Sequence, residues 1–299
     1  MFSTLLGRLP AIPNLVAALE DIGLELLASG EPPAGPDIEP GEVVAGWRVV
    51  AEQTERPVKQ ALLGPYASGD GADPGRLAEA ITALASAGCP FVEIVEPDLA
   101  PIVGSAAERE LFVAAHRALF AALPTDDAAV HCSLVVGGGN LDAAGAATFF
   151  DLPYPSYAFD LIDGPDNWRL IAAAPPDRGI VCGALAARAN GDETREVLVW
   201  AAQYAASTGG RGPDRVGVAN AGSLADLPPD VALRKLRRVA EAARIASASS
   251  AEEVAAQLDS RAFGGRRNRP GGPASRYHPV PPDPGKPAPP VTPTAEGDR

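Results

Sequence analysis

The chain alternates between short apolar runs and longer amphipathic segments from its first residues to about residue 247. Each apolar run has the length of a buried strand, and most are followed by a segment of helical length. This alternation predicts a parallel sheet covered by helices. The apolar runs that we expect to form strands lie at residues 3–6, 24–28, 58–63, 91–95, 129–136, 157–162, 179–185 and 215–219.

Helices are expected between these strands. Asn14 is a candidate N-cap, and the Asp73-Pro74 pair is typical of a helix start. Segment 29–40 is rich in Pro and Gly and is expected to be a loop. Helical patterning is found at 14–22, 74–86, 105–123, 166–171, 193–207 and 230–246. Eight strands, each followed by a helix or a helix-sized segment, predict an α/β fold, a single (β/α)₈ TIM barrel over residues 1–250.

Residues 251–299 differ in character from the rest of the chain. A short helix is expected first, and from about residue 261 the chain becomes rich in Pro and Gly with few large apolar residues. Such a tail cannot bury a core, so we expect it to be disordered or partly polyproline II. Two roles are open for it: a solubilising appendage, or a basic Pro-rich ligand for a partner domain or for the acidic body itself.

Composition narrows the classes of function. The 299-residue chain carries a net charge of -13 and has no basic cluster before residue 260, which argues against nucleic acid as a partner. Its cysteines, Cys89, Cys132 and Cys182, are odd in number and widely spaced, as expected in a reducing cytoplasm. The N-terminal segment lacks a basic region and is interrupted by Pro10 and Pro13, so no signal peptide is expected. No apolar stretch reaches the ~18 residues of a membrane span.

Polar residues follow most of the apolar runs. A (β/α)₈ barrel brings the carboxyl ends of its strands to one face, where such barrels carry their chemistry. Residues far apart in the sequence are therefore expected to meet there. The groups concerned are Gly30-Glu31-Pro32, Gly64-Pro65-Tyr66, Glu96-Pro97-Asp98, His131-Cys132, Asp160 and Asn220.

Several of these motifs together carry a resemblance to a known family. VKQALLGPYASG, GCPFVEIVEPDLA, VHCSLV, AFDLIDGPDNWRLI, RGIVCGALAARANGDET, RVGVANAGSL and LRKLRRVAEAAR occur in that order, after TLLGRLP and LELLASGEP. The set resembles the C-terminal catalytic barrel of cobalamin-independent methionine synthase, which shares a superfamily with uroporphyrinogen decarboxylase. The resemblance covers residues 3–247. No single motif is specific, and the argument rests on their order.

The resemblance implies a reaction and a site. It implies methyl transfer from methyltetrahydrofolate to a homocysteine thiol, with zinc stabilising the thiolate. The residues at the family's positions are Glu31 and Glu96 for substrate binding, His131 and Asp160 for catalysis, and His131, Cys132 and Asp160 as metal ligands. Its substrate would be a small molecule, either a thiol or an amino acid.

The chain also departs from the family pattern. Ser133 stands at the position of a ligating cysteine, and ANAGSL lacks the cysteine that follows strand eight in the family. Val95 replaces an aspartate that holds the substrate's amino group, Ala186 replaces another aspartate, and residues 67–70 lack the folate-side tryptophan. The zinc ligand set is therefore incomplete, and we expect at most weak zinc binding. The function implied is a divergent thiol-directed methyl or alkyl transferase.

Each candidate residue also has a structural interpretation. Histidines, cysteines and carboxylates can all serve packing, capping or turn formation. On that interpretation His131 is a core histidine, Cys132 and Cys182 are inert, Glu96 is a cap, Asp160 and Asp163 form a turn, Gly137–Gly139 is a flexible loop, and His116 is solvated.

Two other functions remain open from the sequence. One is a uroporphyrinogen-decarboxylase-like or other acid–base enzyme on the same barrel, using Glu31, Glu96, His131 and Asp160. The other is a catalytically silent barrel that binds a small molecule. The functions are distinguished by whether His131, Cys132, Asp160 and Glu31 converge within the reach of metal ligands.

Overall fold

The structure is a computed structural model that describes residues 1–29, 39–69, 73–124, 130–189, 193–248 and 250–258. All of these lie in one compact unit, Met1–Phe263, and only this unit is described below. The second unit, Gly264–Arg299, lies outside the described residues. The expectation of a disordered tail concerns that segment and stays a prediction.

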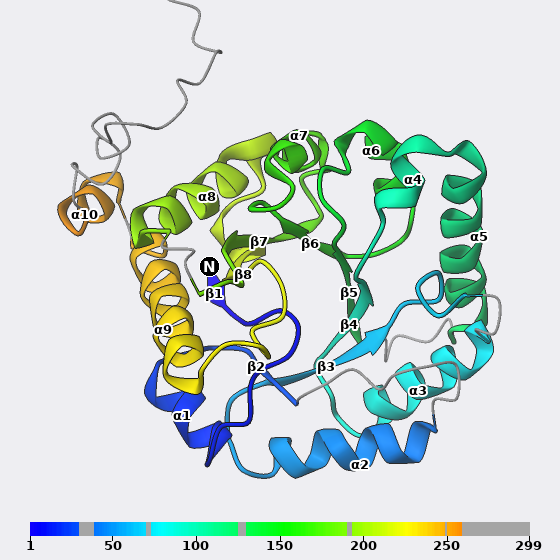
Figure 1. The fold of residues 1–299 in the computed structure, drawn as a ribbon, viewed down its shortest axis with the longest axis horizontal. Coiled ribbons are helices and arrows are strands. Elements are labelled where there is room, and N and C mark those ends of the chain that lie inside the picture. The colour runs from blue at the N-terminus through cyan, green and yellow to red at the C-terminus, as the bar shows by residue number, and fades with distance from the viewer. Residues whose placement is uncertain (30–38, 70–72, 125–129, 190–192, 249, 259–299) are drawn as a thin grey trace, which may run out of the picture. The chain divides into compact units, whose positions relative to one another are not determined.

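Eight parallel strands form the centre of the fold, which confirms the predicted α/β barrel (Figure 1). They are β1 (Phe2–Ser3), β2 (Leu27–Ala28), β3 (Val58–Leu63), β4 (Phe91–Glu96), β5 (His131–Val136), β6 (Ser156–Asp160), β7 (Gly179–Leu185) and β8 (Val216–Asn220). Their order in the sheet is β1-β8-β7-β6-β5-β4-β3-β2. The N–H of Leu26, just before β2, donates to the carbonyl of Ser3 in β1 over 3.0 Å. That hydrogen bond links the segments of β1 and β2, which stand at the two ends of this strand order.

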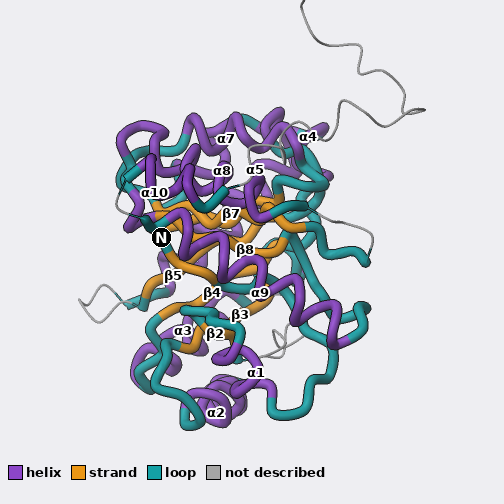
Figure 2. Tube along the Cα trace, turned by 90° about the vertical axis from the view of Figure 1, so that its left-hand side faces the viewer, coloured by secondary structure: helices purple, strands orange, loops and turns teal. Residues whose placement is uncertain are grey.

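Helices surround the strands, and Figure 2 shows the strands as an inner layer. The helices are α1 (Leu15–Asp21), α2 (Pro40–Ala51), α3 (Pro74–Ser86), α4 (Ala100–Gly104), α5 (Ala106–Ala122), α6 (Ala146–Phe150), α7 (Trp168–Ala173), α8 (Arg195–Ser207), α9 (Pro229–Ala246) and α10 (Ala251–Ala256). Short 3₁₀ helices are η2 (Asp142–Ala144), η3 (Pro165–Asn167), η4 (Thr208–Gly210) and η5 (Pro213–Arg215). Within the described part of the chain, no helix is both long and apolar enough to cross a membrane.

Local sequence accounts for several helix starts. The Asp73 side chain caps α3 by accepting from the N–H of Gly75, as the Asp-Pro pair predicts. The cap expected at Asn14 is wrong, because this residue has a left-handed backbone (φ 52°) and its side chain makes no cap bond. Helix α2 is absent from the sequence expectations. Its pattern is nevertheless helical: Pro40 opens it, and the buried Val43 and Trp47 are four residues apart.

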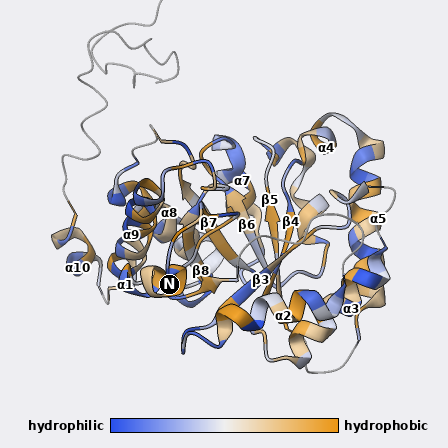
Figure 3. Ribbon diagram, turned by 60° about the horizontal axis from the view of Figure 1, so that its bottom comes forward, coloured by the Kyte–Doolittle hydropathy of each residue, from blue (hydrophilic) through white to orange (hydrophobic). Residues whose placement is uncertain are grey.

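The alternation of side chains along each strand divides the barrel into an inside and an outside. On β3, Val58 and Leu62 point outward into the layer shared with the helices, so Lys59 and Ala61 point inward. The apolar layer between strands and helices is the main core, and a smaller cluster of Leu6, Ala158, Val181 and Ala219 fills the interior. Figure 3 shows hydrophobic and hydrophilic residues mixed along α2, α3 and α5, as expected of helices with one buried face.

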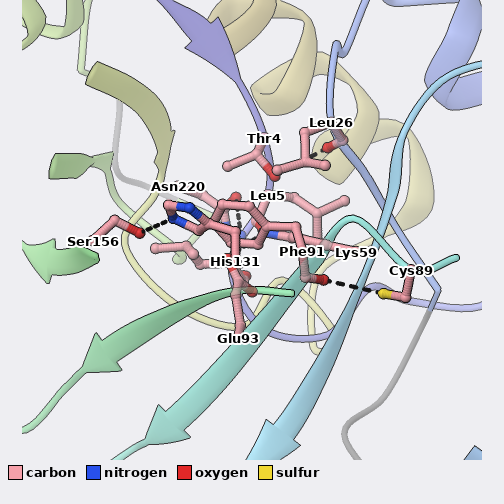
Figure 4. Close-up of polar contacts among 11 residues, drawn as sticks. Thr4, Leu5, Leu26, Lys59, Cys89, Phe91, Glu93, His131, Ser156 and Asn220 are labelled. Atoms are coloured by element: carbon pink, nitrogen blue, oxygen red, sulfur yellow. Dashed lines mark hydrogen bonds and ion pairs between the residues drawn. The ribbon is translucent and has the colours of Figure 1, made fainter. Parts of the chain in front are cut away.

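His131 lies in the floor of the barrel, at the amino end of β5. Its ring stacks on that of Phe91, with centroids 4.6 Å apart, and its Nε2 lies 2.7 Å from the Ser156 hydroxyl (Figure 4). Burial lowers the pKa of the imidazole. His131 is therefore a neutral, half-buried ring that packs the floor, at the end of the barrel away from the expected site.

Glu96, the last residue of β4, is completely buried and points outward from the barrel. Its Oε1 accepts the N–H of Tyr66 over 3.0 Å, and its Oε2 accepts the N–H of Ala67 over 2.7 Å. The Nε2 of His116 lies 3.1 Å from Oε1, and the Nδ1 of the same ring lies 2.7 Å from the Tyr154 hydroxyl. This Glu96–His116–Tyr154 group fixes the loop that follows β3. The expectation of a solvated His116 is wrong, because the helix that carries it packs this face against the barrel wall.

Gly64 is required by the same arrangement. A Cβ atom at this position would overlap the Cγ, Cδ and Oε1 atoms of Glu96. The Gly-Pro-Tyr motif after β3 and the Glu-Pro motif after β4 are thus two halves of one structural unit. The structural interpretation of Glu96 as a cap is the one that the geometry supports.

Replacing Gly64 by Ala should therefore destabilise the protein, by about 2 kcal/mol or more, because the buried carboxylate must give up its bonds to Tyr66 and Ala67. The matched control is Gly46→Ala in α2, where a Cβ meets nothing within 4 Å and helix propensity favours Ala. Urea unfolding at pH 7 measures both. Equal effects of the two substitutions would contradict the role given to Glu96.

A second prediction concerns pH. The unfolded chain binds a proton at His131 near the ordinary pKa of about 6.5, whereas the folded chain, with its lowered pKa, does not. Stability should therefore fall as pH drops from about 7.5 to 5.5. A His131→Gln variant lacks this contribution and should lose less stability over the same interval. Urea unfolding of both proteins at the two pH values tests this, and equal losses would show that His131 is not buried as a neutral ring.

Candidate active site

The carboxyl ends of the strands form the mouth of the barrel. Figure 1 shows the chain after β1 and the chain after β8 running over this region. The two segments are joined there, since the N–H of Leu224 donates to the carbonyl of Arg8 over 2.8 Å. Asn220, at the end of β8, accepts from the N–H of Leu6 and donates to its carbonyl. Asn220 is completely buried, so it connects β8 to β1 and does not line the mouth.

The base of the mouth is apolar on the side of β3 to β5. Leu63, Val95 and Val135 pair across these strands and point inward. All three are half-buried, whereas their outward-facing neighbours Leu62 and Ile94 are completely buried. An inward-facing residue that stays partly exposed at the end of a strand lies where a ligand can reach it. Any ligand at this base therefore meets hydrocarbon.

Asp160 provides a carboxylate at the rim of this base. It ends β6, two residues beyond Ala158, which pairs with Val135, and it points inward by alternation. Its Oδ1 accepts the N–H groups of Ile162 and Asp163 over 2.7 and 3.0 Å. Burial raises the pKa of the carboxyl, although the two N–H bonds oppose that effect. Since both bonds go to Oδ1, Oδ2 is the oxygen that can face a ligand.

The glycine-rich segment after β5 packs tightly against its neighbours. A Cβ on Gly137 would press on the carbonyl of Pro97, and one on Gly138 would lie 2.8 Å from the N–H nitrogen of Ala100. The side chain of Asn167 donates to the carbonyls of Gly139 and Asp160, over 3.1 and 2.8 Å. The segment is thus pinned to the loops after β4 and β6. The interpretation of Gly137–Gly139 as a flexible loop is wrong for this reason.

The residues expected as metal ligands do not meet. His131 and Cys132 begin β5, whereas Asp160 ends β6, and the register pairs Ser133 with Ser156. Six strand residues therefore separate the level of His131 from that of Asp160, about 20 Å along the strands, and five separate that of Cys132. Within the described ranges, no group of three His, Cys, Asp or Glu side chains could hold a metal ion. The set of His131, Cys132 and Asp160 is corrected accordingly, because residues at opposite ends of parallel strands cannot share an ion.

The cysteines are buried and free. Burial raises the pKa of the Cys132 and Cys182 thiols to about 12, so both stay protonated at neutral pH. A protonated, buried thiol is neither a nucleophile nor a metal ligand. This agrees with the structural interpretation of both residues.

The two carboxylates expected to bind substrate have different outcomes. Glu96 faces the layer between β4 and α5, so it contacts the loop after β3 and does not line the mouth. Glu31 lies outside the described residues. Its role in substrate binding, implied by the resemblance, stays a prediction.

A buried ion pair inside the barrel is absent from the sequence expectations. Lys59 of β3 donates to Glu93 of β4 and to the carbonyl of Leu5 (Figure 4). Burial lowers the pKa of the lysine and raises that of the glutamate, and each partner opposes the shift in the other. Both side chains lie below Ala61 and Val95, so they support the mouth from beneath. Opposite charges at inward-facing positions of two neighbouring strands were the signal that could have identified the pair.

Comparison with known proteins supports the fold. No family model matches the chain. No curated protein matches it either. Among solved structures, a B12-independent methionine synthase from Shewanella sp. W3-18-1, in complex with selenomethionine, is similar with a TM-score of 0.62 and 13% identity, over 81% of this chain and 96% of that one.

A second similar structure is the putative vitamin-B12 independent methionine synthase from Listeria monocytogenes. Its TM-score is 0.61 at 14% identity, and the match covers 82% of this chain and 97% of that one. A match at this identity establishes a shared fold and does not by itself establish a shared activity. The chain is therefore an α/β barrel with the same fold as these B12-independent methionine synthases.

Proposed function

We propose that this protein is an enzyme that transfers a methyl or other alkyl group to a small thiol at the mouth of its barrel. The observation that carries the proposal is the position of Asp160, an inward-facing, partly buried carboxylate above an apolar base. The similarity in fold to a methionine synthase in complex with selenomethionine supports a sulfur-bearing amino acid as the first substrate to test. Methyltetrahydrofolate as the donor follows from the sequence resemblance alone.

Asp160 would act as the base in this reaction. The S–H bond of the substrate breaks and its proton passes to Oδ2, while the sulfur forms a bond to the alkyl carbon. The bond between that carbon and the donor breaks, and its electron pair leaves with the donor, which then takes the proton. A raised pKa suits a carboxylate for proton transfer, because it comes closer to the pKa of a thiol, about 8.5.

Zinc does not fit the described side chains, so no step is assigned to it. The family's mechanism needs about four ligands, and Asp160 is the one member of the expected set at the mouth. In a reaction assisted by Asp160 alone, the thiol is less acidic than a thiol bound to zinc. The apolar residues Leu63, Val95 and Val135 at the bottom of the mouth would compensate in part for the missing metal by excluding water. Without water, the interaction between the thiol and the carboxylate is stronger.

Calorimetric titration with methionine and homocysteine tests the proposal. Asp160→Asn should weaken binding about tenfold or more, because a charged partner for the amino or thiol group is lost. The matched control is Asp163→Asn, the same change three residues away on an exposed side chain that pairs with Arg188. Equal losses in the two variants, or no binding to the wild type, would contradict the proposal.

Metal analysis gives a separate prediction. Protein dialysed after exposure to zinc should retain well under one equivalent, because the described residues bring no three ligands together. His131→Ala should leave the zinc content unchanged, since that ring lies in the floor of the barrel. Stoichiometric zinc that disappears in His131→Ala would restore the metal-dependent mechanism.

A further inference from the structure

A cavity of about 520 Å³ lies within the loop that connects β1 to α1. It is lined by Leu9, Ile12 and Leu15 from the loop and helix, and by Leu5 and Ala28 from the barrel wall, with further Gly, Ala and Pro residues between them, and it is partly open to solvent. We call it the loop cavity. Ala28 ends β2 and Leu5 follows β1, so the cavity lies at the carboxyl ends of these strands, the end of the barrel at which Asp160 also lies.

The chemistry of the lining is uniform. None of the lining residues in the described part of the chain has a charged or hydrogen-bonding side chain. Two of the five loop residues between Leu9 and Pro13 are prolines, which carry no N–H group. Water in such a cavity has few hydrogen-bond partners and is readily displaced by an apolar group.

The loop is also held in place independently of any ligand. Gly7 has φ +72°, and a Cβ there would lie 2.8 Å from the backbone of Ser223. The next residue, Arg8, accepts the N–H of Leu224 through its carbonyl. With Pro10 and Pro13 limiting the backbone beyond this anchor, the cavity is preformed and does not depend on a ligand to shape it.

We propose that the loop cavity is a subsite for an uncharged alkyl or aryl group of the small molecule bound at the mouth. The inference rests on the proposed function in placing that molecule at the mouth. It adds that the substrate carries a sizeable apolar part. The volume is in the range of ligand pockets. The mouth at the same end of the barrel also has an apolar bottom, formed by Leu63, Val95 and Val135.

Straight-chain alcohols from butanol to octanol test the subsite directly, because they are uncharged and carry neither an amino group nor a thiol. The full chain should bind them with an affinity that rises about fourfold per added methylene, followed by NMR or calorimetry. Ile12→Asp, which places a charge in the wall, should weaken octanol binding at least tenfold. Ile12→Thr, similar in shape, should weaken it less and serves if the Asp variant does not fold.

The control is Leu111→Asp, which puts the same charge on a leucine that is 59% exposed on α5 and does not line the cavity. Its alcohol binding should equal that of the wild type. Absence of chain-length dependence in the wild type, or equal losses in Leu111→Asp and Ile12→Asp, would overturn the inference. Alcohol binding that persists where methionine and homocysteine fail to bind would count against the proposed function and leave the apolar subsite standing.

Discussion

In a closed barrel, two properties of each strand residue decide what it can do: its level along the axis, and whether it points inward or outward. Asp160 lies at the carboxyl end and points inward, so it belongs to the mouth. Glu96 lies at the same end and points outward, so it belongs to the barrel wall. His131 is at the amino end, so it belongs to the floor. These three placements follow from strand geometry before any chemistry is considered.

The polar groups behind the wall have a common role. Glu96 holds the loop after β3, Asn220 ties β8 to β1, and Asn167 ties the loop after β5 to that after β6. Each is buried, so loss of one partner would leave an unsatisfied group in a medium of low dielectric constant. The described loop segments at these strand ends are therefore held by buried side chains that do not line the mouth. The described part of the rim is fixed by these hydrogen bonds around an apolar bottom, a suitable setting for a single carboxylate.

The barrel is well predicted from the sequence because the same pattern, an apolar strand followed by a helical segment, occurs eight times. Alternating apolar and helical segments recur, so errors such as the failed cap at Asn14 or the missed helix α2 do not change the architecture. The candidate site is predicted less well because it depends on single residues. A shift of one position along a strand reverses the direction of a side chain. The family resemblance that assigns Glu96 to the substrate does not give that direction. The expected strand at 129–136 already places His131 near its amino end, and the family resemblance assigned it to the carboxyl end in spite of that.

The same reasoning explains why the buried polar pairs were not predicted from the sequence. Lys59 and Glu93 are distant in the chain, and their pairing depends on the register between β3 and β4. His116 looked solvated because helix periodicity alone does not say which turn of α5 faces Glu96 and Tyr154. Local pattern gives the direction of a side chain, and tertiary packing gives its partner.

The central claim is that small molecules bind at the mouth of this barrel and not at its floor. Hydrogen–deuterium exchange of the full chain, with and without saturating methionine, tests it directly. The account predicts slower exchange at Ile162 and Asp163, whose N–H groups bond to Asp160, and no change in the floor segments around Ser156 and Arg215. Protection at the floor around His131, with the loop after β6 unaffected, would contradict it.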